Sequence, residues 1–300
     1  MFKIEIDYSP AYELITSLYT YLQTTELKIT EVGVAWHKSV KELIDPNFQT
    51  VLKDKKLEVL HRLSLLVWQC KEDRSAKGFI DWLEKLSPSE VYTYLVPWVE
   101  KLPKNMNEIH LLLIEILKNW NEQYFSKIDS VILDALKMDV DQKRGIVAEF
   151  NPTDFVENCT NGIRIESPKI EKILLIPQYH NSPHSIVDYY DGIVTCSYPV
   201  DIEDGDLFLK KNVSRQIRAL SDRTRVQILK FLYTEARTFS DIQKLTGLVK
   251  SNVNYHLKLL RTAGLIRAHH NSQRVEKYSL REEALKEMNQ GLFNYIEGVE

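Results

Sequence analysis

The last third of the chain contains short amphipathic segments that end in a charged hairpin. Ser221 is expected to cap a helix over 222–233, from which Arg225 points outward. Ser240 is expected to cap a second, shorter helix, and Gly247 suits the left-handed residue that ends it. The pattern therefore predicts two short helices in close succession.

A third helix is predicted to begin near Lys250. Val253, Leu257 and Leu260 recur at i, i+4 and i+7, which is the spacing of a buried helical stripe. Gly264 is expected to end this helix. The face opposite the stripe carries amide, hydroxyl, aromatic and ammonium groups, which are the groups that reach base edges and phosphates.

A hairpin is predicted after the third helix. Residues 265–269 and 275–280 are expected to pair, and residues 271–274 form the tip. Arg267 is expected to point outward from this hairpin. Short helices closed by a basic hairpin are typical of a winged helix-turn-helix, which places one helix in a DNA major groove.

The charge distribution favours the same conclusion. The whole chain has a net charge of -3, but residues 211–280 hold 14 Lys/Arg against 4 Asp/Glu, a net charge of +10. The preceding 210 residues hold 23 Lys/Arg against 33 Asp/Glu. A basic block on an acidic chain indicates a polyanionic partner that binds at one end, and we expect this partner to be double-stranded DNA.

The predicted DNA contacts lie on the third helix and the hairpin. Asn252 and Asn254 are expected to read bases, since carboxamides pair with adenine. His256 lies beside the apolar stripe, so support of the helix is an alternative role for it. The complete predicted set is Lys250, Ser251, Asn252, Asn254, Tyr255, His256, Lys258, Arg261, Arg274 and Lys277.

The C-terminal block resembles the ArsR/SmtB family of bacterial winged-helix transcriptional regulators. The matching pieces are Ala219-Leu-Ser-Asp-Arg-Thr-Arg225 with Ile228-Leu229, Ser251-x-Val253-x-x-His256-Leu257-Lys258-x-Leu260, and Ala263-Gly-Leu265. They cover about 70 residues. The resemblance implies a homodimer that binds a twofold operator and switches nearby genes, and it favours a dimer-forming helix over 282–300.

Two features depart from that family. Its metal sensors place thiols before the recognition helix, where this chain has Thr238-Phe-Ser-Asp-Ile242, and residues 281–300 contain no histidine. Other metal sensors of that family use His with Asp or Glu on the C-terminal helix. We therefore expect neither a thiol site nor a histidine site for a metal in this chain. The chain also carries about 210 residues in front of the winged helix, as the longer members do.

The remaining sequence bounds the class of protein. The first residues form no apolar leader, and no apolar run is long enough to span a bilayer, so a cytoplasmic protein without membrane contact is expected. Three scattered cysteines predict neither a disulfide framework nor a metal knuckle. No phosphate loop, nucleophile elbow or HExxH motif occurs, so no cofactor, catalytic residue or enzymatic activity is expected.

The fold is expected to be mainly α with small β elements. The predicted parts are a mainly helical domain over 1–145, a mixed α/β part over 146–207 and the winged helix over 211–300. Strands are expected at 2–6, 170–176 and 192–200. His180 and His184 have a ligand-like interval, but Pro183 argues against a helix that would align them.

The sequence thus predicts a homodimeric, sequence-specific regulator, acting as a repressor. Residues 1–145 are expected to serve dimerisation or the sensing of an unidentified small-molecule effector. The alternative is a ligand-binding or enzymatic N-terminal domain fused to a non-specific DNA-binding module.

Overall fold

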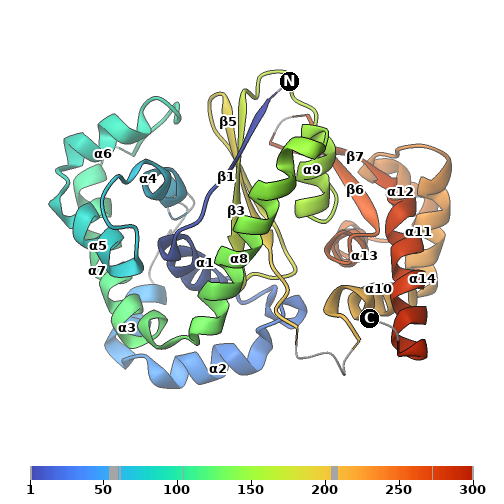
Figure 1. Cartoon of the computed structure of the whole chain (residues 1–300), viewed down its shortest axis with the longest axis horizontal. Helices are drawn as coiled ribbons and strands as arrows, with labels where there is room; N and C mark the ends of the chain where they lie inside the picture. Colours follow the sequence, from blue (N-terminus) through green and yellow to red (C-terminus); the bar gives the residue numbers. More distant parts are fainter. Residues whose placement is uncertain are drawn as a thin grey trace. The chain divides into compact units, whose positions relative to one another are not determined.

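The computed structural model describes residues 2–53, 60, 62–103, 105–203, 209–271 and 273–298 (Figure 1). The chain forms two compact units, each built from two segments. The first unit comprises Met1–Ile146 and Ile170–Val200, and the second comprises Val147–Lys169 and Asp201–Glu300. The fold is mainly α with small β elements, as expected from the sequence.

The first unit combines a small sheet with many helices. Its strands are β1 (Lys3–Ile6), β3 (Lys172–Gln178), β4 (Ile186–Tyr189) and β5 (Ile193–Pro199). Its helices are α1 (Pro10–Leu22), α2 (Gly33–Leu43), α3 (Pro46–Lys53), α4 (Leu63–Gln69), α5 (Ala76–Lys85), α6 (Pro88–Leu95), α7 (Met106–Gln123) and α8 (Ser130–Ile146). Residues 54–59 and 61, between α3 and α4, lie outside the described residues.

The sheet of the first unit has the strand order β1-β3-β5-β4. β1, β3 and β5 run parallel, and β4 pairs antiparallel with β5. β3 and β5 are almost entirely buried, as is usual for parallel strands that are covered on both faces. The three strands predicted from the sequence are thus confirmed, and β4 completes the sheet.

Different helices cover the two faces of this sheet. Leu174 and Ile176 of β3 join the large core that contains residues of α1 and α4–α7. Tyr198 points to the other face, where its hydroxyl donates to Asp139 of α8 at 2.6 Å. Ser9 caps α1, because its side chain accepts the Ala11 N–H at 3.1 Å.

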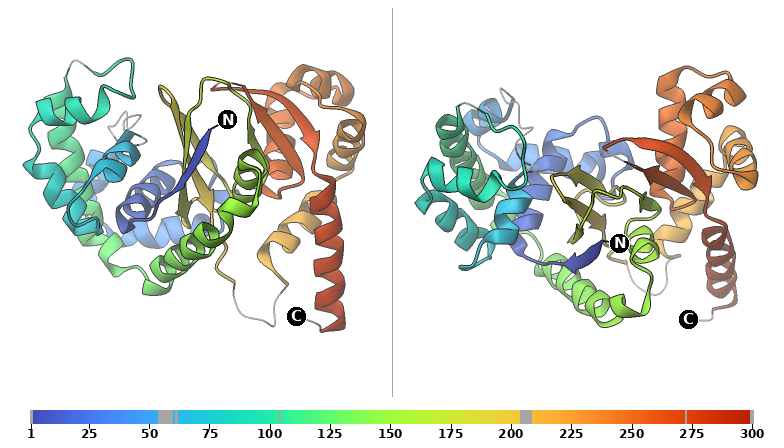
Figure 2. Two further views of the ribbon diagram at one scale, coloured as in Figure 1. Left: turned by 45° about the horizontal axis from the view of Figure 1, so that its top comes forward. Right: turned by 90° about the horizontal axis from the view of Figure 1, so that it is seen from above.

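The second unit contains the predicted winged helix and more. Its helices are α9 (Pro152–Cys159), α10 (Lys211–Leu220), α11 (Arg223–Thr234), α12 (Phe239–Thr246), α13 (Lys250–Thr262) and α14 (Glu282–Glu297), and its strands are β2 (Ile163–Ile165), β6 (Ile266–His270) and β7 (Val275–Leu280). β6 and β7 form the predicted hairpin, which runs directly into α14 (Figure 2).

The structure divides the chain differently from the division expected at residues 145 and 207. β1 completes a sheet with β3 and β5, so the helical segment and residues 170–200 form one unit. Residues 147–169 belong to the other unit, because β2 pairs parallel with β6. A short strand must pair its backbone groups with partners wherever they lie in sequence.

None of the helices that the structure describes is both long enough and apolar enough to cross a bilayer.

A side chain is not expected to fit at Gly162, in the turn before β2. Gly162 has φ +108°, and an added Cβ would lie 2.4 Å from the Ile266 carbonyl oxygen of β6. Gly162→Ala is therefore expected to lower the free energy of unfolding of the second unit by about 2 kcal/mol or more. Urea unfolding followed by circular dichroism tests this.

Gly145→Ala is the matched control, since Gly145 is helical and an added Cβ meets nothing within 4 Å. It should leave stability unchanged or raise it by about 0.5–1 kcal/mol. Equal stability of the Gly162→Ala protein and the wild type would contradict the tight approach of this turn to β6.

Candidate DNA-binding surface

Two capped helices precede α13 and fix its start. Asp222, rather than the expected Ser221, caps α11 by accepting the Arg225 N–H at 3.0 Å. Thr238, rather than Ser240, caps α12 and forms a reciprocal capping box with Asp241. Each actual cap lies where its side chain can reach free N–H groups of the first turn. Gly247 ends α12 with φ +66°, as predicted.

The buried stripe of α13 holds the helix on its domain. Val253, Leu257 and Leu260 are at most 3% exposed and lie in the core of the second unit. That core also contains Ile228 and Leu232 of α11. Full burial of one such side chain contributes about 1.5–3 kcal/mol, so the stripe fixes which face of α13 points outward. The predicted helix and its buried face are confirmed.

The opposite face of α13 is exposed and polar. Lys250, Ser251, Asn252 and Asn254 are all exposed on the first two turns, and Tyr255 is 54% exposed. The helix thus presents an ammonium group, a hydroxyl, two carboxamides and a phenol side by side. These groups can donate to phosphate oxygens and pair with base edges.

His256 is half-buried and contacts the first helix of the motif. Its Nδ1 lies 3.9 Å from Oδ1 of Asp222, the residue that caps α11. The pKa of Asp222 is lowered, mainly by the hydrogen bond from the Arg225 backbone N–H and further by the positive charges of Arg225 and His256. This contact favours a supporting role for His256, which the sequence left as an alternative to DNA contact.

The other predicted cations differ in exposure. Lys258 and Arg261 are half-buried on the second half of α13, and Arg274 and Lys277 are exposed on the β6–β7 hairpin. Residue 272 at the hairpin tip lies outside the described residues. The structure therefore brings seven of the ten predicted residues to the surface as exposed side chains, on α13 and on the wing.

Two arginine side chains that were expected to point outward, Arg267 and Arg225, are engaged within the second unit. Arg267 donates to Glu157 Oε1 at 2.7 Å, to the Leu280 carbonyl oxygen at 2.6 Å and to Glu283 at 3.0 Å. Arg225 is buried and donates to the carbonyl oxygens of Ala219 and Arg218. His269 contacts Glu166 and Ser279 through its two ring nitrogens. Buried backbone and carboxylate acceptors attract these donors inward.

Glu157 of α9 is the centre of an ionic cluster that the sequence analysis missed. It is 4% exposed, and its carboxylate accepts from Arg267 of β6 at 2.7 Å, from Arg281 after β7 at 3.2 Å and from Arg164 of β2 at 2.8 Å. All three arginines hold one buried anion. The cluster therefore ties α9 to the sheet formed by β2, β6 and β7, which we call the wing sheet. It contacts β2 and β6 directly, and it contacts β7 through Arg281, the residue that follows that strand.

The only sequence signal for this arrangement was weak. Ile163-Arg-Ile165 alternates apolar and polar residues after the Asn161-Gly162 turn signal, but three residues are too few to indicate a strand. No local pattern could pair Glu157 with arginines more than 100 residues away.

The first unit contains a buried polar network of its own. His180 is 1% exposed, with Nδ1 2.6 Å from Glu13 and Nε2 2.6 Å from the Tyr124 hydroxyl, which also accepts from Trp36 Nε1. Both ring nitrogens of His180 are thus occupied by protein groups. No cluster of His, Cys, Asp and Glu suited to a metal ion occurs among the described residues.

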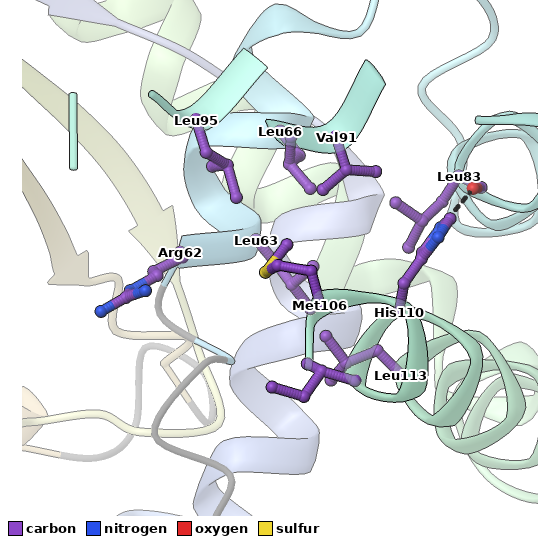
Figure 3. A pocket seen from close by; sticks show the side chains of 10 residues that line it. Arg62, Leu63, Leu66, Leu83, Val91, Leu95, Met106, His110 and Leu113 are labelled. Carbon is purple, nitrogen blue, oxygen red and sulfur yellow. Dashed lines mark hydrogen bonds between the residues drawn. The ribbon is translucent and has the colours of Figure 1, made fainter. Parts of the chain in front are cut away.

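A small apolar cavity also lies in the first unit. Its volume is about 20 Å³, and Figure 3 shows side chains of α4, α6 and α7 around it. His110 is turned toward the Leu83 carbonyl oxygen, 2.8 Å from its Nε2. A cavity of this size holds about one water molecule, so an effector pocket would have to open further.

The ionic cluster predicts a strong dependence of the wing on one carboxylate. Glu157→Gln leaves the buried Arg281 without a compensating anion and Arg267 with Glu283 alone, and is expected to lower the local stability of β6 and β7 by roughly 3 kcal/mol. Hydrogen-exchange mass spectrometry of the peptides that span the hairpin measures this opening free energy.

Glu282→Gln, at an exposed position of α14, is the control and should change exchange by less than about 0.5 kcal/mol. Unchanged protection of β6 and β7 in Glu157→Gln would show that Glu157 does not hold the wing.

Comparisons with known proteins assign the C-terminal region. The profile described as "Bacterial regulatory protein, arsR family" matches residues 222–268. The uncharacterized HTH-type transcriptional regulator YceK of Bacillus subtilis (strain 168) is 35% identical over 71 residues, which are 23% of this chain and 70% of that protein. Residues 222–268 contain α11, α12, α13 and most of β6.

Two solved structures are also similar to part of the chain. One is a crystal structure of a possible transcriptional regulatory protein from Mycobacterium bovis, with 25% identity and a TM-score of 0.24, covering 27% of this chain and 88% of that one. The other is a solution structure of a homodimeric winged helix-turn-helix domain from M. bovis, described as a possible ArsR-family regulator. It has 24% identity and a TM-score of 0.26, and covers 34% of this chain and 94% of that one.

The sequence match and the capped helices, buried stripe and wing lead to one conclusion. The chain belongs to the arsR family of bacterial regulatory proteins, with a DNA-binding winged helix-turn-helix in its C-terminal third.

Proposed function

We propose that the protein is a sequence-specific transcriptional repressor that binds its operator as a homodimer. The observation that carries this proposal is the exposed polar face of α13, held outward by the fully buried stripe beneath it. A helix presented in this way inserts its first turns into a major groove.

The residues of this surface divide into two roles. Asn252 and Asn254 read bases, because a carboxamide offers the donor and acceptor that match adenine in the major groove. The cations Lys250, Lys258, Arg261, Arg274 and Lys277 neutralise phosphates. These contacts supply most of the affinity and make it strongly dependent on salt.

The helix α14 is the proposed dimer contact. Phe293 and Ile296 lie one turn apart on α14 and are 51% and 68% exposed. Ile217 of α10 is 38% exposed, and α10 packs against α14 where Gly291 approaches Val213. An exposed apolar cluster of this kind favours association, and an isologous contact would give the operator twofold character.

The first unit is proposed to serve sensing or assembly rather than catalysis. Its buried Glu13 and His180 side chains and the half-buried Tyr124 hydroxyl are joined by hydrogen bonds. A ligand-binding or enzymatic first unit fused to a non-specific DNA-binding module is the alternative, and DNA binding that ignores sequence would support it.

Base readout by α13 predicts a loss of specific affinity on removal of one carboxamide. Asn254→Ala is expected to weaken operator binding by about 5- to 150-fold while it leaves binding to unrelated duplexes unchanged. Fluorescence anisotropy with duplexes that tile the DNA upstream of the gene, at two salt concentrations, measures both affinities. Asn107→Ala, on an exposed face of α7, is the control. Equal affinity of Asn254→Ala and wild type for the operator would remove Asn254 from the readout.

The proposed dimer contact predicts a change of assembly. The double variant Phe293→Asp/Ile296→Asp should raise the dissociation constant of the dimer by at least about tenfold, because charge would replace apolar contact area. Sedimentation equilibrium measures this, with Gln290→Asp at an exposed polar position as the control. A dimer that survives the double substitution would locate the contact elsewhere in the chain.

A further inference from the structure

A polar pocket of about 240 Å³ lies within the second unit, beside the C-terminal end of α13. Its wall is formed by residues of α9, α10 and α14, by Asn161 after α9, by Arg281 before α14 and by the end of α13. The lining side chains that could recognise a ligand are Asn158, Asn161, Asn212, Gln216, Arg281 and Glu287.

The cations near this pocket are already neutralised. Arg281 donates to Glu157 at 3.2 Å, to the Gly264 carbonyl oxygen at 2.8 Å and to Asn158 at 3.2 Å. Arg215 forms a two-point ion pair with Asp201. Glu287 adds a negative charge to the wall. A strong anion therefore finds no unpaired positive charge here, and the Glu287 carboxylate can accept hydrogen bonds from hydroxyl groups.

The rest of the recognition groups are carboxamides. The oxygens of Asn158 and Asn212 already accept from Arg281 and from the Val213 N–H, so these two side chains offer mainly their N–H donors. Asn161 and Gln216 offer both an acceptor and donors, a combination that matches neighbouring hydroxyl groups, which both donate and accept. Gln216 is 5% exposed, and its Oε1 has no hydrogen-bond partner among the described residues. A buried unpaired acceptor costs about 1–3 kcal/mol. Rotation of the Gln216 carboxamide by about 180° exchanges its oxygen and nitrogen atoms. A ligand could therefore either donate to the oxygen or accept from the nitrogen.

We infer that this pocket binds an uncharged, polyhydroxylated small molecule of about monosaccharide size. The pocket has room for several water molecules, enough for a ligand of roughly one sugar ring. The paired arginines and the four carboxamides set the chemical class.

The pocket is placed to act on the DNA-binding surface. Arg281, in its wall, also holds the wing through Glu157 and the end of α13 through Gly264. A ligand that moves the Arg281 side chain therefore changes the position of α13 relative to the β6–β7 hairpin. This regulatory consequence rests on the proposed function, whereas binding of the ligand does not.

Direct binding is tested by saturation-transfer NMR on the full chain without DNA. The probes are D-glucose, D-ribose and myo-inositol, with the anion D-gluconate as the charged counterpart. Binding of at least one neutral probe is expected, weakened at least tenfold in both Gln216→Leu and Asn161→Gly. Asn161 has φ +57°, so glycine removes its carboxamide while it keeps the backbone geometry. Gln290→Leu, at an exposed position of α14, is the matched control and should bind as wild type does.

Three outcomes would overturn the site: no binding of any neutral probe, binding of gluconate alone, or neutral binding that both pocket variants retain. Operator anisotropy with and without the bound probe then tests the regulatory step, for which at least a threefold change in affinity is expected. Binding in the pocket with unchanged operator affinity would overturn that step alone. Absence of any operator binding by the wild type, with the NMR result intact, would instead reject the proposed function.

Discussion

The buried carboxylate of Glu157 is the interaction on which the DNA-binding unit depends. Burial of an anion is costly, and here arginines from β2, from β6 and from the residue after β7 offset that cost together. Loss of this one carboxylate would leave the buried Arg281 without an anionic partner, whereas Arg164 and Arg267 would keep more exposed carboxylates. The α9–β2 segment is therefore an integral part of the winged helix rather than a linker that passes by it.

The same cluster connects the wing to the recognition helix. Arg281 donates both to Glu157 and to the carbonyl oxygen of Gly264, which follows the end of α13. At the other end of the motif, Arg225 joins the start of α11 to the last turn of α10. Buried or half-buried arginines thus hold the geometry of a surface whose proposed DNA-contacting cations are other residues. Part of the positive charge of residues 211–280 therefore serves this internal purpose.

The two units are joined by the chain at three points, after residues 146, 169 and 200. The strand β2 lies in the second unit, pairs with β6 and is followed within a few residues by β3 of the first unit. Residues 166–169 thus connect β2 to the first unit through the chain. This covalent route gives a sensing role for the first unit a physical means of reaching the DNA-binding surface.

Local patterns alone determined the helices and hairpin of the winged helix, the buried stripe of α13 and the exposed face of Lys250, Asn252 and Asn254. Periodicity and capping chemistry act over a few residues, so they can be read from the sequence. The third wing strand, the inward turn of Arg267 and the shared sheet of β1, β3 and β5 were decided only by the tertiary structure. Each depends on partners more than 100 residues apart, because buried charges and strand backbones must find complementary groups wherever the fold supplies them.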